Sequence, residues 1–464
     1  MADPLQHFFA LMEAQGFVVV QNAPKLDLEL YIQNYRGRTR FERLFFIGRS
    51  SVTLCVEALK AAVAEAKQGR DVQRYREAVE CLRVAAPNDP AAVLDKSWVG
   101  RQDAFNRQET ARILAEIKVY KNNLVKESIR IGHEDLGKHL ESIGDLAGAT
   151  EAFNKMRPDV STVKQLLEVG KHLIRTAIQR REWGGIHSHF SKLLFKGDNP
   201  DEEKTVQPYV NIAKGITHLY LGEYQEACDN FLTTESNTIN TPSYAEIASR
   251  NDVAVYGGLL ALATMNRIGL QHDVLDNDNF RGFLETEPHI RRAINAFVTG
   301  RYSACIQILE TYRPDYLLDI HLHKHISTIY SMIRSKCIVQ YLLPFSCIKL
   351  QTIAEAFSCT EQAIASELAD MIQQGKLKAR INLIDGVSQL LSTVRIDPRT
   401  QMQAEALASA EDYERQAIER LRRMSLAAAD LELRQAKQKN VPILSSSVNE
   451  FEFQAEDEDS MMAY

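Results

Sequence analysis

The spacing of apolar and small residues predicts paired helices over two stretches of the chain. Residues 136–153 read LGKHLESIGDLAGATEAF, in which Gly137, Gly144, Ala149 and Phe153 stand at intervals that suit two short antiparallel helices. Residues 215–231, GITHLYLGEYQEACDNF, repeat the same order of glycine, glycine, alanine and phenylalanine. Small residues let two helices approach closely, and a glycine between them makes the turn.

Weaker copies of this pattern occur around residues 75–82, 183–190 and 300–309. The last position of the copies recurs at one or two intervals of about 38 residues, which is typical of a helical repeat array. The pattern resembles the tetratricopeptide repeat. It predicts a mainly α fold that begins with a tetratricopeptide-like helical-repeat solenoid. Ordinary amphipathic helices that carry glycine and alanine by chance are the alternative.

The hydrophobic period changes after the repeats. We expect one helix over 321–341, a short helix over 350–357 and a second helix over 361–374 that ends at Gly375. An alternating strand and a turn at Asp385-Gly386 then lead into a second strand over 387–391. The apolar positions of this hairpin are Leu377, Ala379, Ile381, Leu383, Val387 and Leu390. Helix, turn, helix and hairpin together predict a winged helix.

The second helix of this predicted winged helix does not suit DNA. It carries Glu361, Glu367 and Asp370 and contains no lysine or arginine, so it would repel phosphates rather than neutralise them. An exposed strand edge can instead pair with another protein. We therefore expect the strands over 377–391 to bind a protein partner.

Residues 399–438 contain no glycine or proline and predict one long helix. An apolar seam with a 3.5-residue period runs through this helix, which suits a coiled coil or a helical bundle. A seam that folds back onto the same chain is the alternative. The seam residues expected to bind a partner are Leu407, Ala417, Leu421, Met424 and Leu431. Residues 450–459 hold six acids and no base, so we expect a disordered tail.

These patterns divide the chain into successive parts. We expect an N-terminal extension, a first block of helical repeats, a polar linker loop, a second block of repeats, a winged helix, a C-terminal bundle helix and an acidic disordered tail. The corresponding ranges are 1–25, 26–195, 196–208, 209–315, 316–395, 399–438 and 440–464.

Composition narrows the class of protein. The chain has 464 residues with 55 Lys+Arg and 61 Asp+Glu, a net charge of -6, which disfavours a general binder of nucleic acid or of anionic membranes. The seven cysteines form no CxxC pair, so a disulfide framework or a zinc ribbon is not expected. No apolar run approaches the length of a transmembrane helix, and the N-terminus makes a poor signal peptide. We expect a protein of the nucleus and cytoplasm that binds neither nucleic acid nor membrane.

A search for an active site finds no convincing candidate. The motifs HExxH, GxSxG, GxxxxGK[ST] and GxGxxG are all absent. His321, His323 and His325 come close to a metalloprotease motif, but Arg334 stands where a metal-binding aspartate is needed, and in a helix His321 and His323 would point apart. We expect surface or repeat-packing histidines, and no catalytic, cofactor or metal site.

One basic stretch, residues 36–43, stands out near the N-terminus and carries Arg36, Arg38, Arg40 and Arg43. A phosphate or RNA site is one alternative. The expected roles are an electrostatic contact to an acidic protein partner or salt bridges with neighbouring helices.

Helical repeats, a winged helix and a long final helix resemble the PCI-domain family, whose members occur in the proteasome lid, the signalosome and translation initiation factor three. Three segments, 26–50, 116–146 and 251–267, closely resemble PCI subunits of the COP-nine signalosome. This resemblance implies a non-catalytic scaffold of a complex that removes a ubiquitin-like modifier from cullins, the JAMM metalloprotease site belonging to another subunit.

The resemblance also implies the partners. They would be the other PCI and JAMM/MPN subunits of the signalosome, met through winged-helix edges and a bundle of C-terminal helices. The N-terminal repeats would meet cullin-RING ligase components or their adaptors. A proteasome-lid subunit and a free-standing tetratricopeptide-type adaptor that binds peptides remain the alternatives, and a metalloprotease is a third, unexpected class.

Overall fold

The computed structural model describes residues 4–193, 200–235, 246–345, 347–384, 388–393 and 398–429. The chain forms two compact units, Met1–Val394 and Arg395–Tyr464. The first part of the larger unit contains α1 (Pro4–Ala14), α2 (Leu28–Gln33), α3 (Gly37–Ser50), α4 (Cys55–Gln68), α5 (Val72–Ala85), α6 (Lys96–Asn122), α7 (Lys126–Ile143), α8 (Leu146–Met156), α9 (Val163–Arg180) and α10 (Trp183–Leu193).

The second part of this unit leads to a small sheet. It contains α11 (Pro200–Leu221), α12 (Tyr224–Leu232), α13 (Arg250–Thr264), α14 (Arg267–Gly269), the π-helical turn η5 (Leu270–Leu275), α15 (Asp278–Leu284), α16 (Pro288–Val298), α17 (Tyr302–Leu317) and α18 (Ile326–Leu342). The winged-helix module follows with β1 (Cys347–Lys349), α19 (Leu350–Ala356), α20 (Glu361–Gln373), β2 (Ala379–Ile384) and β3 (Ser388–Thr393).

The helix pairs predicted from glycine and phenylalanine are confirmed. Helix α7 ends at Gly144, whose φ of +96° favours glycine, and a Cβ on Gly137 would overlap the ring of Phe153 on α8. The α11–α12 pair has the same construction, since a Cβ on Gly215 would lie 2.7 Å from the ring of Phe231. Because glycine stands opposite each ring, the two helices of a pair can pack closely.

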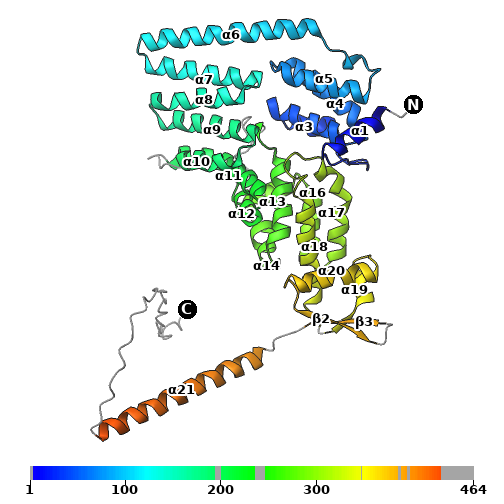
Figure 1. The fold of residues 1–464 in the computed structure, drawn as a ribbon, viewed down its shortest axis with the longest axis vertical. Helices are drawn as coiled ribbons and strands as arrows, with labels where there is room; N and C mark the ends of the chain where they lie inside the picture. Colours follow the sequence, from blue (N-terminus) through cyan, green and yellow to red (C-terminus); the bar gives the residue numbers. More distant parts are fainter. Residues whose placement is uncertain are drawn as a thin grey trace, which may run out of the picture. The chain divides into compact units, whose positions relative to one another are not determined.

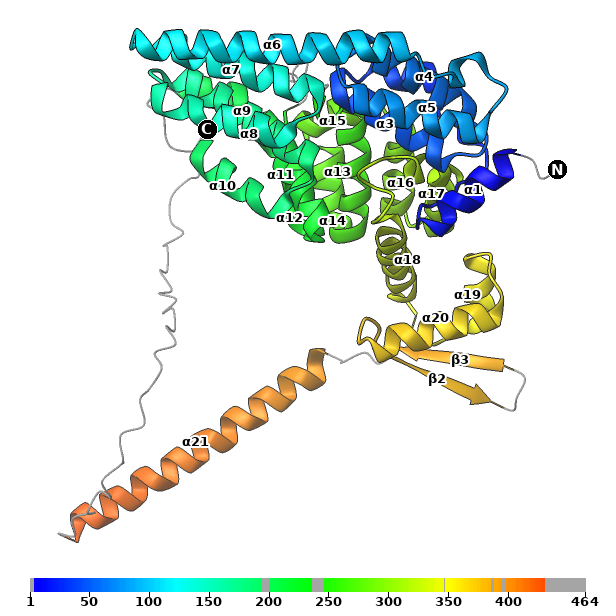
Figure 2. The ribbon, with the colours of Figure 1, turned by 45° about the horizontal axis from the view of Figure 1, so that its top comes forward.

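The helices stack in chain order, as a repeat array requires. Figures 1 and 2 show α6 to α10 in succession, with α3, α4 and α5 beside α6 and α7. Helices α13 and α16 to α18 then lead from the array to the winged helix (Figure 1). One apolar core runs from Ile174 in α9 to Ala379 in β2, so the predicted boundary near residue 195 does not divide this core, whereas the first helices of the chain pack around a separate core. None of the described helices combines the length and apolarity needed to cross a bilayer.

The predicted linker loop over 196–208 is wrong for most of its length. Residues 200–208 form the start of α11, and residues 194–199 lie outside the described part of the chain. The polar composition suggested a loop, but Pro200 occupies the first helical position, where its missing N–H leaves no hydrogen bond unmade. The predicted boundary at 315 likewise falls inside α17.

The winged helix is confirmed and has one strand more than the hairpin predicts. Its strand order is β1-β3-β2, with both pairs antiparallel, and Gly375 follows α20 at a φ of +72°. The helix predicted over 321–341 begins only at Ile326. Asp319 accounts for this, because its Oδ1 accepts hydrogen bonds from the backbone N–H groups of His321 and Leu322, which holds residues 319–325 in turns.

The smaller unit contains α21 (Pro398–Ala428), where a long helix over 399–438 was predicted. Its start agrees with the prediction within one residue. The predicted end at 438 and the acidic tail over 440–464 lie outside the described residues.

Candidate protein-interaction site

The winged helix offers a strand edge rather than apolar side chains. Leu377 and Ala379 are buried in the core of the module, and Ile381 packs against that core from a half-buried position. Their side chains therefore hold the module together. Strand β2 has β3 on one side and, among the described strands, none on the other. The backbone of β2 is thus what this edge can offer to a partner strand.

The remaining wing residues are placed by register alone. Leu383 lies on β2 opposite Gln389, and Leu390 lies on β3 opposite Asn382 and Lys349. Val387 falls outside the described residues. The expected role of these residues in binding a partner stays a prediction.

Helix α21 exposes the predicted seam. Leu407, Leu421 and Met424 are 65%, 63% and 68% exposed, and Ala417 is half-buried. Leu431 lies outside the described residues. A row of large apolar side chains open to water favours association with other apolar surfaces, since their burial is favourable.

The basic cluster is largely paired within the chain. Arg38 lies 3.0 Å from Asp71, and Arg40 lies 3.2 Å from Glu65. Both therefore form salt bridges with neighbouring helices, which was one of the two expected roles. Arg36 is exposed, and the structure pairs it with no carboxylate among the described residues. Only Arg36 remains open for the expected contact with an acidic partner.

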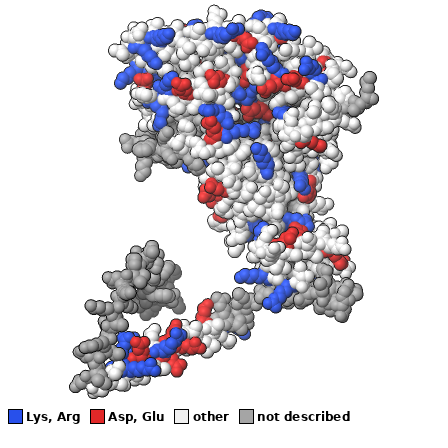
Figure 3. Space-filling view, viewed as in Figure 1, with Lys and Arg blue, Asp and Glu red and all other residues white. Residues whose placement is uncertain are grey.

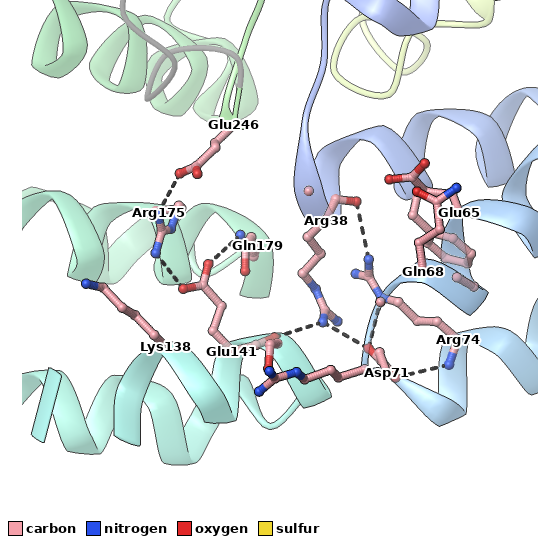
Figure 4. Close-up of a pocket in the computed structure, with 16 residues that line it drawn as sticks. Arg38, Glu65, Gln68, Asp71, Arg74, Lys138, Glu141, Arg175, Gln179 and Glu246 are labelled. Atoms are coloured by element: carbon pink, nitrogen blue, oxygen red, sulfur yellow. Dashed lines mark hydrogen bonds and ion pairs between the residues drawn. The ribbon is translucent and has the colours of Figure 1, made fainter. Parts of the chain in front are cut away.

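Arg38 also lines a charged cavity of about 690 Å³ between α3–α5 and the repeats. Figure 4 shows Arg38 reaching toward Asp71 and the backbone oxygen of Glu141, with Arg74 on the same carboxylate of Asp71. Burial, and then the charge of Arg74, lower the pKa of Arg38. On the face seen in Figure 3, basic and acidic side chains are likewise interspersed over the repeat helices.

The opposite wall of this cavity belongs to α7, α9 and the segment before α13. Arg175 donates to Glu141 at 2.6 Å and to Glu246 at 2.5 Å, as Figure 4 shows. Burial lowers the pKa of Arg175, but the two carboxylates outweigh it and raise the pKa above its ordinary value. These ion pairs connect helices of different repeats, so the cavity walls are held together by charges of both signs.

A second charged cluster is fully buried around Arg43, a residue of the basic stretch whose burial and partners the sequence analysis did not predict. Arg43 on α3 donates to Asp252 at 2.8 Å and to Asp319 at 2.7 Å, and its side chain is 0% exposed. Its guanidinium lies 4.1 Å from the ring centre of Tyr35, and Tyr256 donates to Asp319 at 2.8 Å. The cluster joins α3 to α13 and to the turn before α18. No short-range sequence pattern could reveal this cluster, because Asp252 and Asp319 lie 209 and 276 residues from Arg43 in the chain.

The three histidines after α17 pack against aromatic rings, as expected. His321 is buried and lies edge-on to Tyr220, and His323 lies on the ring of Phe46. Burial lowers the pKa of His321 to about 3 and also lowers the pKa values of His323 and His325. These side chains are therefore neutral inside the fold near pH 7.

One group of side chains could hold a metal ion by its geometry. Possible ligand atoms of His218, Glu223 and Glu226 lie within 4.8 Å of one another at the α11–α12 turn. His218 Nδ1 lies 2.7 Å from Glu223 and 3.2 Å from Glu226, and both glutamates are largely exposed. A hydrogen bond between His218 and Glu223 across the turn is sufficient to explain this arrangement.

Comparison with known proteins adds the family. Residues 95–273 match the family 26S proteasome subunit RPN7, and residues 309–388 match the PCI domain. The chain is 50% identical to COP9 signalosome complex subunit 1 of Neurospora crassa over 94% of each chain, and 32% identical to the subunit 1 of Arabidopsis thaliana over 89% and 92%. It is 22% identical to the 26S proteasome non-ATPase regulatory subunit 6 homolog of Arabidopsis thaliana over 67% and 78%. The chain therefore belongs to the family of COP9 signalosome complex subunit 1.

Proposed function

We propose that this protein is a non-catalytic scaffold subunit of the COP9 signalosome. It assembles with the other PCI and JAMM/MPN subunits. The complex removes the ubiquitin-like modifier from cullins, and the metalloprotease site that does so belongs to another subunit. The names of the relatives and the PCI domain support membership of the complex. The repeats, with exposed Arg36 at their start, would meet cullin-RING ligase components or adaptors.

The exposed seam of α21 is the observation that carries this proposal. Leu407, Leu421 and Met424 are each about two-thirds exposed. Burying most of each side chain in a helical bundle would contribute about 1–2 kcal/mol per residue, or about 3–6 kcal/mol together. A free-standing adaptor gains nothing from such a helix, whereas a subunit of a bundle needs it. The open backbone edge of β2 provides a second, directional contact.

Co-purification tests the seam. In the tagged full chain, Leu421→Asp with Met424→Asp should release the other subunits, because two carboxylates would face an apolar bundle. Leu426→Asp is the matched control, since at 100° per residue it lies on the other side of α21 from Leu421. Equal recovery of the complex with the double variant and the control would contradict the bundle assignment.

The same purification separates the alternatives. A proteasome-lid subunit would bring down proteasome proteins, which the lower identity to that family disfavours. A free-standing peptide-binding adaptor would be recovered alone and would not depend on residues 316–431. Isopeptidase turnover by the pure chain would contradict a scaffold role altogether.

The proposed location is the nucleus and the cytoplasm. All seven cysteines are free thiols, which fits these reducing compartments. Fluorescence of the tagged full chain in both compartments, compared with the tag alone, tests the location.

A further inference from the structure

A pocket separate from the wing strands and α21 lies in the larger unit. It has a volume of about 340 Å³ and opens between the segment 25–34, α13 and α16–α17. Its rim includes Leu30, a leucine that is 63% exposed. Its inner wall is formed by the outer side of the cluster around Arg43, through Asp252 and Asp319. Nothing in the scaffold role requires a cavity here.

The pocket carries an excess of negative charge. Five carboxylates line it, and the cations that face them are Lys25 in the lining and Arg43 behind it. These two cations leave three of the five carboxylate charges uncompensated. The carboxylates are those of Asp27, Asp252, Glu287, Asp315 and Asp319. Such an excess in a concave site attracts cations and focuses their field.

Aromatic rings form the wall between these carboxylates. The rings of His289 and Tyr312 are stacked with centroids 3.9 Å apart. The ammonium of Lys25 lies 4.5 Å from the centroid of Tyr312, within the range of a cation–π contact. The chain thus already places one cation of its own on this ring face, and Lys25 is exposed and able to leave it.

The negative charge of Asp315, which lies next to this ring, is only partly compensated within the chain. Asp315 accepts a hydrogen bond from the backbone N–H of Lys25 at 2.8 Å. Burial still raises the pKa of Asp315 above its usual value. An additional cation beside Asp315 would stabilise its charged form.

We propose that this pocket binds a lysine or arginine side chain from a basic segment of a partner protein. The cation lies on the face of Tyr312 in place of Lys25, with Glu287 and Asp315 beside it, and the aliphatic part of the side chain packs on Leu30. Basic peptide is favoured over other ligands because the wall combines carboxylates with aromatic rings and an apolar rim. The proposal does not depend on the assembly role of β2 or α21.

Peptide binding to the full chain tests the pocket. The probe is a fluorescein-labelled Gly-Ser peptide with three lysines, followed by anisotropy at low salt, with glutamine replacing lysine as the control peptide. Tyr312→Leu should weaken binding about fivefold by removing the ring face, and Glu287→Gln about threefold by removing one charge. Lys25→Ala should tighten binding about threefold, because it empties the ring face and removes a competing cation.

A matched variant separates the pocket from general surface charge. Glu310→Gln removes one carboxylate from α17, the helix that carries Tyr312 and Asp315, at a position outside the pocket, and should leave the affinity unchanged. Equal weakening by Glu310→Gln and Glu287→Gln, or equal affinity for the glutamine peptide, would overturn the proposal. So would a Tyr312→Leu variant that keeps its far-UV circular dichroism and binds as the wild type does.

Asp315→Asn guards against a folding defect, since an amide oxygen can still accept the Lys25 N–H. It should weaken the lysine peptide while leaving co-purification of signalosome subunits intact. Loss of peptide binding with an intact complex supports the pocket, and unchanged peptide binding rejects it. The α21 variants test the proposed assembly role, so their failure and a failure of the pocket variants can be told apart.

Discussion

Replacing Arg43 by methionine should destabilise the larger unit more than any exposed arginine change. Methionine fills most of the volume of the arginine stem but carries no charge. The change leaves Asp252 and Asp319 buried without their shared cation. Tyrosine hydroxyls and backbone N–H groups continue to donate to both carboxylates, so the hydrogen bonding is reduced rather than lost.

The magnitude follows from this geometry. Removing one partner of a buried ion pair costs about 3–5 kcal/mol, because it leaves an uncompensated charge. Here two carboxylates lose the same cation, which places the expected loss at the upper end of that range. In the native protein burial raises the pKa of Asp319, but Arg43, His321 and the hydrogen bond from Tyr256 together outweigh burial and lower this pKa to about 2. Without Arg43 the pKa of this carboxyl rises, so the variant should lose less stability at pH 5 than at pH 7.

Urea unfolding of the full chain, followed by circular dichroism, measures this loss. Arg40→Met is the matched control, since Arg40 lies on the same helix, is 38% exposed and makes one ion pair with Glu65. Such a pair contributes about 0.2–1 kcal/mol. The triple change Arg43→Met, Asp252→Asn, Asp319→Asn should recover much of the loss, because no charge then remains. Equal losses for the two methionine variants, or no recovery in the triple variant, would refute the reasoning.

Three further measurements test other parts of the fold. Gly137→Ala should cost about 1–3 kcal/mol in urea unfolding because its methyl overlaps the aromatic ring on α8, whereas Gly184→Ala, with open space around it, should not destabilise. Burial lowers the pKa of His321 to about 3, so the unfolded chain, with a histidine pKa near 6.5, takes up the proton first. The contribution of His321 to the free energy of unfolding should therefore fall by about 2 kcal/mol from pH 7 to pH 5, and His321→Phe should remove this contribution from the pH dependence of the wild type. Exposed Cys347 should react with a thiol reagent at least about a hundredfold faster than Cys55, whose pKa burial raises to about 12; equal rates in a labelling time course would contradict the burial of Cys55.

The parts of the fold that depend on local pattern could be predicted from the sequence. Gly144 at the end of α7 and Gly375 after α20 mark turns that few other residues adopt, and the rings of Phe153 and Phe231 fill the spaces left by glycines. These constraints act within about twenty residues. A periodic pattern is enough to reveal them.

The misplaced boundaries also have local reasons. Residues 200–208 were predicted as a loop because their composition is polar, although Pro200 is well placed to begin a helix. Strand β1 was missed because three residues, Cys347 to Lys349, are too few to show an alternating pattern. Residues 321–325 look helical by composition, but hydrogen bonds to the side chain and backbone of Asp319 and to the backbone of Leu322 hold them in turns.

The candidate site shows a different limit, because most of its contacts join distant parts of the chain. The Arg36–Arg40 cluster could be recognised as basic, but neither the partners of Arg38 and Arg40 nor the buried role of Arg43 follows from spacing. The wing residues were predicted as a binding surface, yet Leu377 and Ala379 turn inward, because an alternating strand directs its apolar face to its own core first. What such a strand leaves for a partner is its backbone edge.

The position of Arg43 bears on the scaffold role proposed above. Helix α3 belongs to the first helices of the chain, whereas Asp319 lies within the PCI domain match at 309–388. Leu318 is buried among the apolar residues of the same N-terminal helices, so an ion pair and an apolar contact join the two regions at one place. A subunit that acts by geometry must fix its N-terminal repeats relative to its winged helix, because a flexible joint would let bound partners drift apart. Arg43→Met should therefore disturb the spacing between partners before it disturbs their individual binding.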